Sequence, residues 1–335
     1  MRTAARWLRA ALPLLCAAAL LTPAAPAEAA QRPRAALAFP VNEPFDSSAN
    51  LGTTSGNASY PAGGGWLRLT SASGNQAGTW KMRDTFSTTL GIVAEFRYAT
   101  YGGTAFEGKR GDGLSFYLTD GSAADGTGPS GGSLGYACAG AASRCLTSGV
   151  PGAYLGIGID EFGNFSSNSV GNGGPGAQAN KIVVRGGGSG TTGYRYATAA
   201  DGPGSTVETG GRDKERRVRI ALLPSGGKLL LSVWSDSGPG TALTQLITDY
   251  DVTTIANQPA LPATLKVGFS AGTGGATNIH EIDDLAINVP ADLKVVKSTD
   301  RSTGAAGDPG SDTVSVANRQ AHDVSGAARS GTPPP

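Results

Sequence analysis

The sequence predicts an all-β protein that folds as an antiparallel β-sandwich of the jelly-roll type. In several short segments apolar and polar residues alternate with a period of two, which is the pattern of strands with one buried and one solvated face. The 335 residues include 51 glycines and 20 prolines, so the chain contains many turns. Short strands joined by glycine-rich turns favour a sandwich over a parallel sheet.

The alternation is clearest in residues 92–98, 218–222 and 265–269, each of which we expect to form a strand. Pro224-Ser225-Gly226-Gly227 separates the second of these segments from another apolar run and predicts a hairpin. Glycine- and serine-rich stretches are expected to be loops, and they cover residues 121–132, 168–179 and 186–193. Loops at the ends of sheets commonly carry binding sites, although the same composition also fits connections without a role.

Residues 1–30 have the pattern of a signal peptide. A basic start is followed by an apolar run at residues 10–21 and by the small-x-small site Ala27-Glu28-Ala29. The run is too short to span a bilayer, and no later stretch reaches about 18 apolar residues, so a retained anchor is the weaker alternative. We therefore expect a secreted or extracellular protein without membrane insertion, whose mature chain begins near Ala30.

Residues 31–289 form the predicted β-domain, which is long enough for one large hydrophobic core. Beyond a boundary near Val289-Pro290, residues 291–297 and 313–318 resemble the first two strands of repeat domains on bacterial surface proteins. Two strands cannot close a sandwich, so residues 290–335 are either a truncated repeat or a disordered linker. The net charge of +1 favours neither nucleic acid nor an acidic membrane as a partner.

The chain has three cysteines, of which Cys16 falls within the predicted signal peptide. A lipoprotein would need a small residue where Leu15 stands, so Cys16 is expected to leave with the signal. Cys138 and Cys145 are separated by six residues and predict a short-loop disulfide in an oxidising compartment. The alternative is a metal site, which would need further ligands that the nearby sequence does not supply.

Three segments, taken in order, carry a resemblance to a known family. They are Gly111-Asp112-Gly113-Leu114-Ser115-Phe116-Tyr117-Leu118, then Leu155-Gly156-Ile157-Gly158-Ile159-Asp160-Glu161-Phe162-Gly163-Asn164, and then Val267-Gly268-Phe269-Ser270-Ala271-Gly272-Thr273-Gly274 followed by His280-Glu281-Ile282. From about Phe39 to Val289 their order and spacing resemble the L-type, legume-lectin-like lectins. The resemblance implies a concanavalin A-like sandwich, a fold shared by lectins and some glucanases, in a secreted bacterial surface protein.

The resemblance also implies a sugar site. A sugar offers hydroxyl pairs and apolar C–H faces, so its site needs a carboxylate acceptor, an amide, a backbone N–H and usually an aromatic surface. Asp112 matches the family's hydroxyl acceptor, Asn164 the amide that bridges sugar and calcium, and Gly132 the N–H donor. The loop 273–278, which contains Gly274 and Gly275, matches the loop that sets specificity. A plainer alternative is that Asp112, between two glycines, only shapes a turn.

For calcium, the positions that match the family's ligands are Asp160, the Phe162 main-chain carbonyl, Asn164 and Asn168. The family usually has aspartate where Asn168 stands, and calcium affinity follows the charge of its oxygen ligands, so we expect a weakened calcium site. The plant members bind a second, transition metal through a glutamate two residues before the aspartate and a downstream histidine. Gly158 occupies the first of these positions and no histidine falls at the second, so this metal is expected to be absent.

Two further expectations concern neighbouring residues. In the family a cis peptide precedes the residue that matches Asp112, so we expect a cis Gly111–Asp112 bond when calcium is bound and a mixture or a trans bond without it. Glu161 follows Asp160 and points to the opposite face of the strand, which indicates a solvated or structural side chain.

Glucanases that share the sandwich need two carboxyls about 5–5.5 Å apart, typically from a Glu-x-Asp-x-x-Glu strand. Gly158 and Gly163 stand at both glutamate positions around Asp160, and only one histidine lies within the domain. We therefore expect a non-catalytic lectin that binds glycans or polysaccharide with the help of calcium at a cell surface. The alternatives are a structural adhesin module with a degenerate sugar site and, less favoured, a glucanase-like glycoside hydrolase.

Overall fold

The computed structural model describes residues 39–47, 51–141, 144–290, 293–299, 303 and 311–318. All of them lie in the second of two compact units of the chain, residues 35–335. The predicted signal peptide and Cys16 fall outside the described residues. Within the described part of the chain, no helix is long and apolar enough to cross a membrane.

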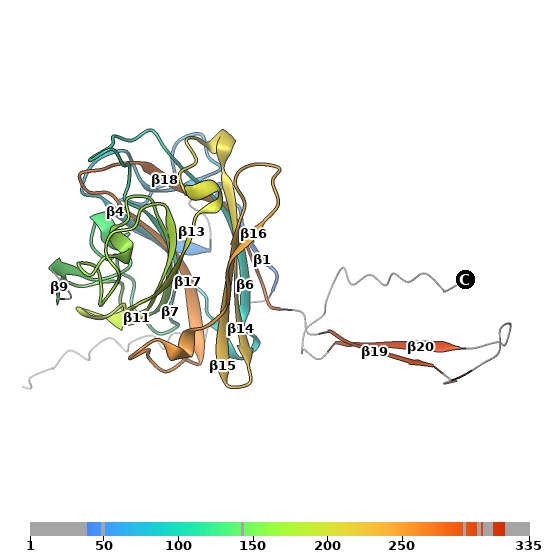
Figure 1. Cartoon of the computed structure of the whole chain (residues 1–335). Helices are drawn as coiled ribbons and strands as arrows, with labels where there is room; N and C mark the ends of the chain where they lie inside the picture. Colours follow the sequence, from blue (N-terminus) through green and yellow to red (C-terminus); the bar gives the residue numbers. More distant parts are fainter. Residues whose placement is uncertain are drawn as a thin grey trace, which may run out of the picture. The chain divides into compact units, whose positions relative to one another are not determined.

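Two large antiparallel sheets make up the described domain and face each other as layers (Figure 1). The nine-stranded sheet contains β2 (Gly52–Gly56), β4 (Ala77–Met82), β5 (Phe86–Ser87), β7 (Gly113–Asp120), β10 (Ala153–Asp160), β11 (Lys181–Ser189), β12 (Thr192–Gly193), β13 (Tyr196–Asp201) and β17 (Thr264–Gly272). The seven-stranded sheet contains β1 (Val41–Glu43), β3 (Leu67–Thr70), β6 (Ile92–Tyr101), β14 (Arg216–Ser225), β15 (Lys228–Ser235), β16 (Thr244–Asp251) and β18 (Ile279–Asn288). The predicted all-β sandwich is confirmed.

The main hydrophobic core lies between these sheets. Phe96 of β6 stacks on Phe116 of β7, with ring centroids 6.1 Å apart and 7° between the ring planes. Phe269 of β17 meets Phe96 edge-on at 4.8 Å. Aromatic pairs in these geometries stabilise a core beyond the area that they bury. The core therefore contains the inward-facing residues of the strands that the alternation predicted.

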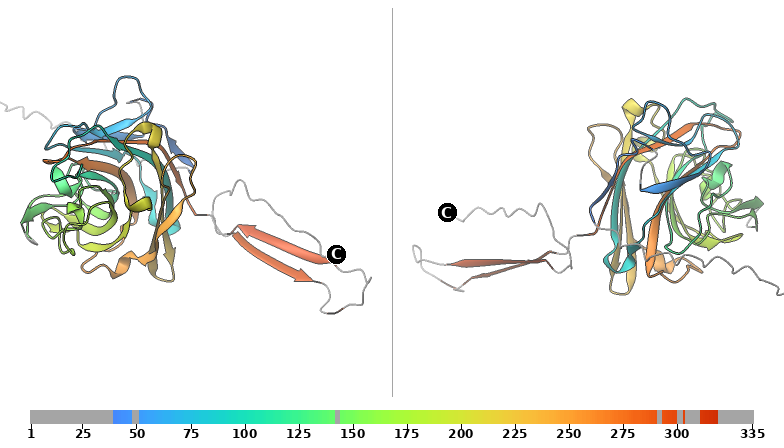
Figure 2. Two further views of the ribbon diagram at one scale, coloured as in Figure 1. Left: turned by 45° about the horizontal axis from the view of Figure 1, so that its top comes forward. Right: turned by 180° about the vertical axis from the view of Figure 1, so that it is seen from behind.

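A second hydrophobic cluster covers the opposite face of the nine-stranded sheet. Tyr117, next to Phe116 on β7, points to this face and lies 5.8 Å from the ring of Tyr136. Tyr136 in turn contacts Phe165 and Tyr194 edge-on. In Figure 2 the loops of residues 121–150 and 161–180, drawn in green, lie on this side of the sheet. The central strands β7 and β10 are thus buried on both faces, and the outer face of the sheet supports the loops.

Strand glycines make room for this second cluster. A Cβ atom built at Gly268 would overlap the Tyr117 ring, and one at Gly158 would overlap the Phe165 ring. Glycine in a strand often marks a place where another group approaches the backbone closely. The glycines of β10 and β17 therefore let aromatic rings lie directly on the sheet.

The individual strand predictions are mostly confirmed. β6, β14 and β17 contain the three alternating segments, and β14 and β15 form the expected hairpin. Its turn is Gly226-Gly227, with φ values of 56° and 82° that favour glycine. The loop prediction for residues 186–193 is wrong, because this run belongs to β11 and β12 and its glycines pack against Tyr194 and Pro259.

The remaining elements are short. Two small hairpins pair β8 (Ala139–Ala141) with β9 (Arg144–Thr147) and β19 (Leu293–Thr299) with β20 (Asp312–Asn318). The described 3₁₀ turns are η1 (Thr88–Leu90), η2 (Gly131–Ser133), η3 (Asn164–Ser166), η4 (Pro203–Ser205), η5 (Arg212–Lys214) and η6 (Val252–Thr254). β19 and β20 agree with the two strands expected after Pro290, while the assignment of residues 290–335 to a separate region stays a prediction.

Candidate functional site

The sheet register brings the predicted site segments together. β7 runs antiparallel to both β10 and β17, and Gly113 at its start is paired with Asp160 and with Gly272 at their ends. Asp112 therefore lies between the loop that follows β10 and the loop that follows β17. The three motifs that carry the family resemblance meet at one edge of the nine-stranded sheet.

Main-chain hydrogen bonds fix this junction. Asp112 donates its N–H to the Gly272 carbonyl at 3.0 Å, and its own carbonyl accepts from Glu161 at 3.0 Å and from Phe162 at 3.2 Å. Gly131 donates to the Thr273 carbonyl at 3.0 Å, which attaches η2 to the same loop. The Gly111–Asp112 peptide is cis, as the resemblance implied; the expected dependence on calcium stays a prediction.

Asp112 is 4% exposed, and the Oδ2 atom of its carboxyl group has no hydrogen-bond partner among the described residues. A Cβ built on Gly274 would lie 3.1 Å from this oxygen, and one on Gly131 4.0 Å, so two glycines border it. The pKa of Asp112 is raised to about 6, mainly by burial and in part by nearby Glu161, while His280 and the Gly274 N–H oppose the shift. The site thus contains a buried acceptor that lacks a donor.

The other predicted sugar contacts lie around this carboxylate. A Cβ on Gly132 would overlap Cβ of Asn164, so η2 and η3 touch at these two residues. The Asn164 side chain is partly exposed and makes no hydrogen bond within the described chain. In the loop after β17, Gly274 and Gly275 reach solvent, whereas residues 276–278 are buried. All five predicted sugar-site residues therefore come together.

Two aromatic rings beside these residues were not assigned to the sugar site from the sequence, where Phe162 was expected only to supply its main-chain carbonyl to calcium. Phe106 is 51% exposed, and its ring centroid lies 6.4 Å from that of Phe162 in a stacked arrangement. A Cβ on Gly275 would lie 3.6 Å from the Phe106 ring, and the Lys109 ammonium lies 5.5 Å from the Phe162 centroid. The rings form a surface of the kind that packs against apolar C–H groups. The sequence did contain a signal for Phe106, because this phenylalanine stands in a glycine-rich segment where a loop is expected.

The sequence analysis expected Glu161 to be solvated or structural; the solvated alternative is wrong and the structural one agrees with its contacts. Glu161 is 1% exposed and accepts a 2.7 Å hydrogen bond from the Asn278 side chain. His280 Nε2 lies 3.4 Å from its other oxygen, and His280 Nδ1 lies 2.7 Å from the Thr70 hydroxyl. Glu161 follows the inward-facing Ile159 by two positions, so it points into the sandwich. The group forms a buried polar support beneath Asp112.

Asp160 is the first of the expected calcium ligands. It is fully buried, and its two oxygens accept the backbone N–H groups of Gly163 at 2.8 Å and Phe165 at 2.9 Å. The carboxylate therefore caps the turn that follows β10, in the way that short acidic side chains commonly satisfy local backbone donors.

The expected ligands do not form a set that fits calcium. Asp160 supplies the one carboxylate, and both its oxygens are already engaged by N–H donors. Asn168 is exposed and neutral where the family has an acid. Carbonyls from Phe165 and Ser167 accept hydrogen bonds from the buried guanidinium of Arg185. Calcium prefers about six to eight oxygens, several of them charged, whereas this loop is held by the cationic side chain of Arg185 from β11.

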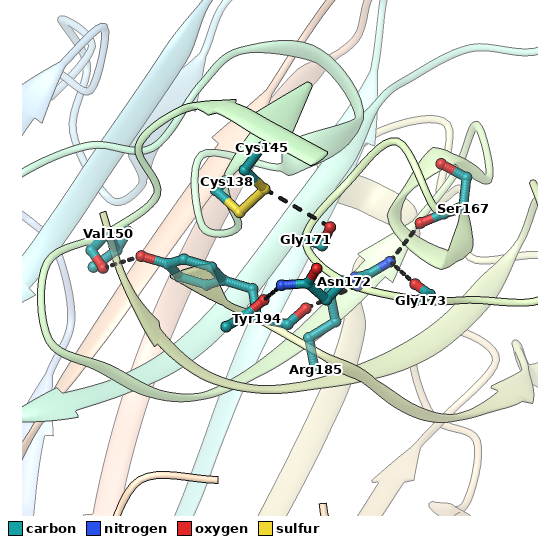
Figure 3. The surroundings of a disulfide bond; sticks show 10 residues. Cys138, Cys145, Val150, Ser167, Gly171, Asn172, Gly173, Arg185 and Tyr194 are labelled. Carbon is teal, nitrogen blue, oxygen red and sulfur yellow. Dashed lines mark hydrogen bonds between the residues drawn. A yellow bond between two sulfur atoms is a disulfide. The ribbon is translucent and has the colours of Figure 1, made fainter. Parts of the chain in front are cut away.

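The Cys138–Cys145 disulfide is present, with a Cα–Cα distance of 5.6 Å, so the predicted pairing is confirmed. It cross-links the two arms of the β8–β9 hairpin, next to the loop that follows η3 (Figure 3). Gly171 of that loop donates to the Cys138 carbonyl at 2.8 Å, and Cys145 Sγ lies 3.7 Å from the Gly171 carbonyl. The disulfide hairpin therefore supports the loop that contains Asn164.

Comparison with solved structures shows the same sandwich in lectins. The metal-free lectin I-B4 from Griffonia simplicifolia matches with a TM-score of 0.51 and 18% identity over 76% of this chain and 100% of its own. The Bauhinia forficata lectin in complex with GalNAc matches with a TM-score of 0.52 and 15% identity over 75% and 98%. The winged bean acidic lectin in complex with methyl-α-D-galactose gives 0.52 and 17% over 74% and 96%. At these identities the likeness shows the fold alone, which is the legume-lectin β-sandwich. No protein-family model matches the chain, and neither does any curated protein.

Proposed function

We propose that this chain is a non-catalytic carbohydrate-binding protein that binds a glycan at the junction of β7, β10 and β17. The observation that carries the proposal is the buried Oδ2 of Asp112, which has no donor in the described part of the chain and lies beside Gly131 and Gly274. A buried acceptor without a donor costs about 1–3 kcal/mol. A sugar hydroxyl is a donor of the size that two glycines can admit.

The neighbouring groups supply the other contacts that a sugar needs. The Asn164 amide can donate to one hydroxyl and accept from another, and Gly132, whose N–H is the expected further donor, touches Asn164. The rings of Phe106 and Phe162 offer an apolar surface for C–H groups. The lectins of the same fold in complex with GalNAc and methyl-α-D-galactose support a sugar ligand here as well.

The strand of Asp160 supports a binding role over hydrolysis. At Gly158 the Phe165 ring fills the place of a side chain. At Gly163, with φ of 110°, a Cβ would lie 2.6 Å from the backbone nitrogen of Ala179. Neither position of the glucanase pattern has space for a glutamate, so the paired carboxyls of that mechanism are not available on this strand.

A glycan array tests the proposal, and it should include glycans that end in galactose, N-acetylgalactosamine and mannose. We expect the full chain to bind a subset of these glycans and Asp112→Ala to lose at least tenfold in signal. Asp120→Ala is the matched control, because Asp120 lies at the other end of β7 and caps Ser122. A wild-type chain that binds no glycan, or Asp112→Ala that binds as wild type does, would refute the proposal.

We also propose an extracellular location at a cell surface. The residues 1–30 pattern supports export, and the Cys138–Cys145 disulfide belongs to the bonds that persist in oxidising compartments. Mass spectrometry of the exported chain under non-reducing conditions, together with N-terminal sequencing, tests both points.

A further inference from the structure

The loop after β10 carries Asn164, and several of its carbonyl groups point to one side chain. Arg185 of β11 donates from Nε to the Phe165 carbonyl at 2.6 Å and from Nη2 to the Ser167 carbonyl at 2.7 Å. Nη2 also reaches the Gly173 carbonyl at 3.3 Å (Figure 3). A single guanidinium therefore joins the start and the end of the loop.

The guanidinium is held on its other sides as well. Nη1 donates to the Tyr194 carbonyl at 2.8 Å, and the group lies over the rings of Phe165 and Tyr196 at 5.4 Å and 5.9 Å from their centroids. Arg185 is fully buried. Although burial lowers its pKa to about 10, the side chain stays charged at neutral pH. A planar cation with five donors fits this ring of carbonyls and aromatic faces, whereas a lysine ammonium does not.

The N–H groups of the same loop are satisfied from the opposite side. Asp160 accepts from Gly163 and Phe165, which flank Asn164 on either side. The chain thus supplies an acceptor for the loop's N–H groups and a donor for its carbonyls. Both side chains are buried, so solvent competes little with these bonds.

We propose that Arg185 is a positioning residue that holds the Asn164 loop in its binding geometry, so that glycan binding at this site needs no calcium ion. The inference rests on the proposed function. It follows from the disagreement between the expected calcium ligands and the contacts present. Both Asp160 oxygens already accept N–H groups, and Asn168 is exposed and neutral. The carbonyls of Phe165 and Ser167 accept from Arg185, so the loop is held without a metal.

The first test uses the unmodified full chain. Amide hydrogen exchange over residues 160–175 is measured with calcium and after dialysis against EDTA, and array binding is measured in the same two buffers. We expect protection in this segment and array signal to agree within twofold between the buffers. A tenfold loss of either on removal of calcium would overturn the proposal.

The second test compares Arg185→Lys with Arg216→Lys. Arg216 is also buried and donates to the carbonyls of Pro203 and Thr206, in a different loop, so its substitution is a matched control for losing a buried guanidinium. We expect Arg185→Lys to lose at least tenfold in exchange protection over residues 160–175 and in array signal, while Arg216→Lys keeps both within threefold at a similar drop in melting temperature.

These outcomes separate the two proposals. If the chain binds no glycan in either buffer, the proposed function fails, and the exchange measurements alone decide whether Arg185 organises the loop. If glycans bind but Arg185→Lys matches wild type in exchange and binding, the role of Arg185 is refuted and the proposed function stands.

Discussion

Acidification should weaken glycan binding through Asp112. The charged carboxylate accepts a hydroxyl hydrogen bond more strongly than the protonated acid does. Burial raises its pKa to about 6, with Glu161 adding to the shift and His280 and the Gly274 N–H opposing it. If the charged form alone binds, the apparent dissociation constant scales with one plus the ratio of protonated to charged carboxyl. Between about pH 7 and pH 5 this factor rises roughly tenfold, which equals about 1.4 kcal/mol.

The stability of the fold responds to the same group with the opposite sign. A carboxyl whose pKa is raised on folding contributes stability that is fully present below its unfolded value of about 3.9 and is lost as the pH rises through about 6. Lowering the pH from 7 to 5 therefore gains stability from Asp112 while binding decreases. Protonation of Asp112 therefore does not destabilise the fold between pH 7 and pH 5, and a loss of binding in this range cannot be attributed to unfolding caused by this residue.

Isothermal titration against the strongest array glycan, at half-unit steps from pH 7 to pH 5, measures the effect. Asp112→Asn should bind at least tenfold more weakly at pH 7 and show no further loss toward pH 5. Because His280, Glu161 and Asp160 lie near Asp112, this variant separates the Asp112 titration from theirs. A wild-type affinity that stays flat, or an Asp112→Asn variant that keeps the wild-type profile, contradicts the reasoning.

Three further variants test other parts of the site and its support. Replacing Cys138 and Cys145 with serine should lower the free energy of unfolding by about 2–3 kcal/mol, as measured by urea denaturation; an unchanged midpoint argues against a stabilising bond. Phe106→Ala should weaken glycan binding about fivefold, for a loss of about 1 kcal/mol of apolar contact, with the melting temperature unchanged because the ring is 51% exposed. Gly132→Ala should reduce affinity at least tenfold, since the new Cβ overlaps Asn164, and wild-type affinity in this variant would place the sugar elsewhere.

The strand pattern of the sequence was sufficient to predict the sandwich, because its main core follows simple alternation. Ile92, Phe96 and Val218 face the interior as their period predicted. Alternation failed where a strand is buried on both faces: β7 carries Phe116 inward and Tyr117 outward, and both are covered. The loop prediction for the glycine-rich residues 186–193 was wrong for a related reason, since rings and loops pack directly on that strand.

The residues of the proposed sugar site could be expected to lie together because each lies in or beside a short motif at a strand end. The partners of those residues come from distant segments, as with Glu161 and Asn278 or Arg185 and Ser167. Arg185 did leave a signal, because it shares a strand face with the buried Val183. A charged residue at such a position is buried with partners or not at all, but the sequence does not show that the partners are carbonyls.

One packed unit contains Gly158, Phe165 and Arg185. It links two departures from the lectin pattern: the glycine at position 158, where the plant lectins have a metal-binding glutamate, and the loop held by an arginine. The Phe165 ring lies against Gly158 on one side and under the Arg185 guanidinium at 5.4 Å on the other, while the Phe165 carbonyl accepts from Arg185. A glutamate at position 158 would displace the ring and with it a carbonyl that the guanidinium needs. Well-packed interiors admit such a change only with compensating movements. An acidic metal ligand at position 158 and an arginine-held loop therefore exclude each other, and the residues present belong to the second arrangement.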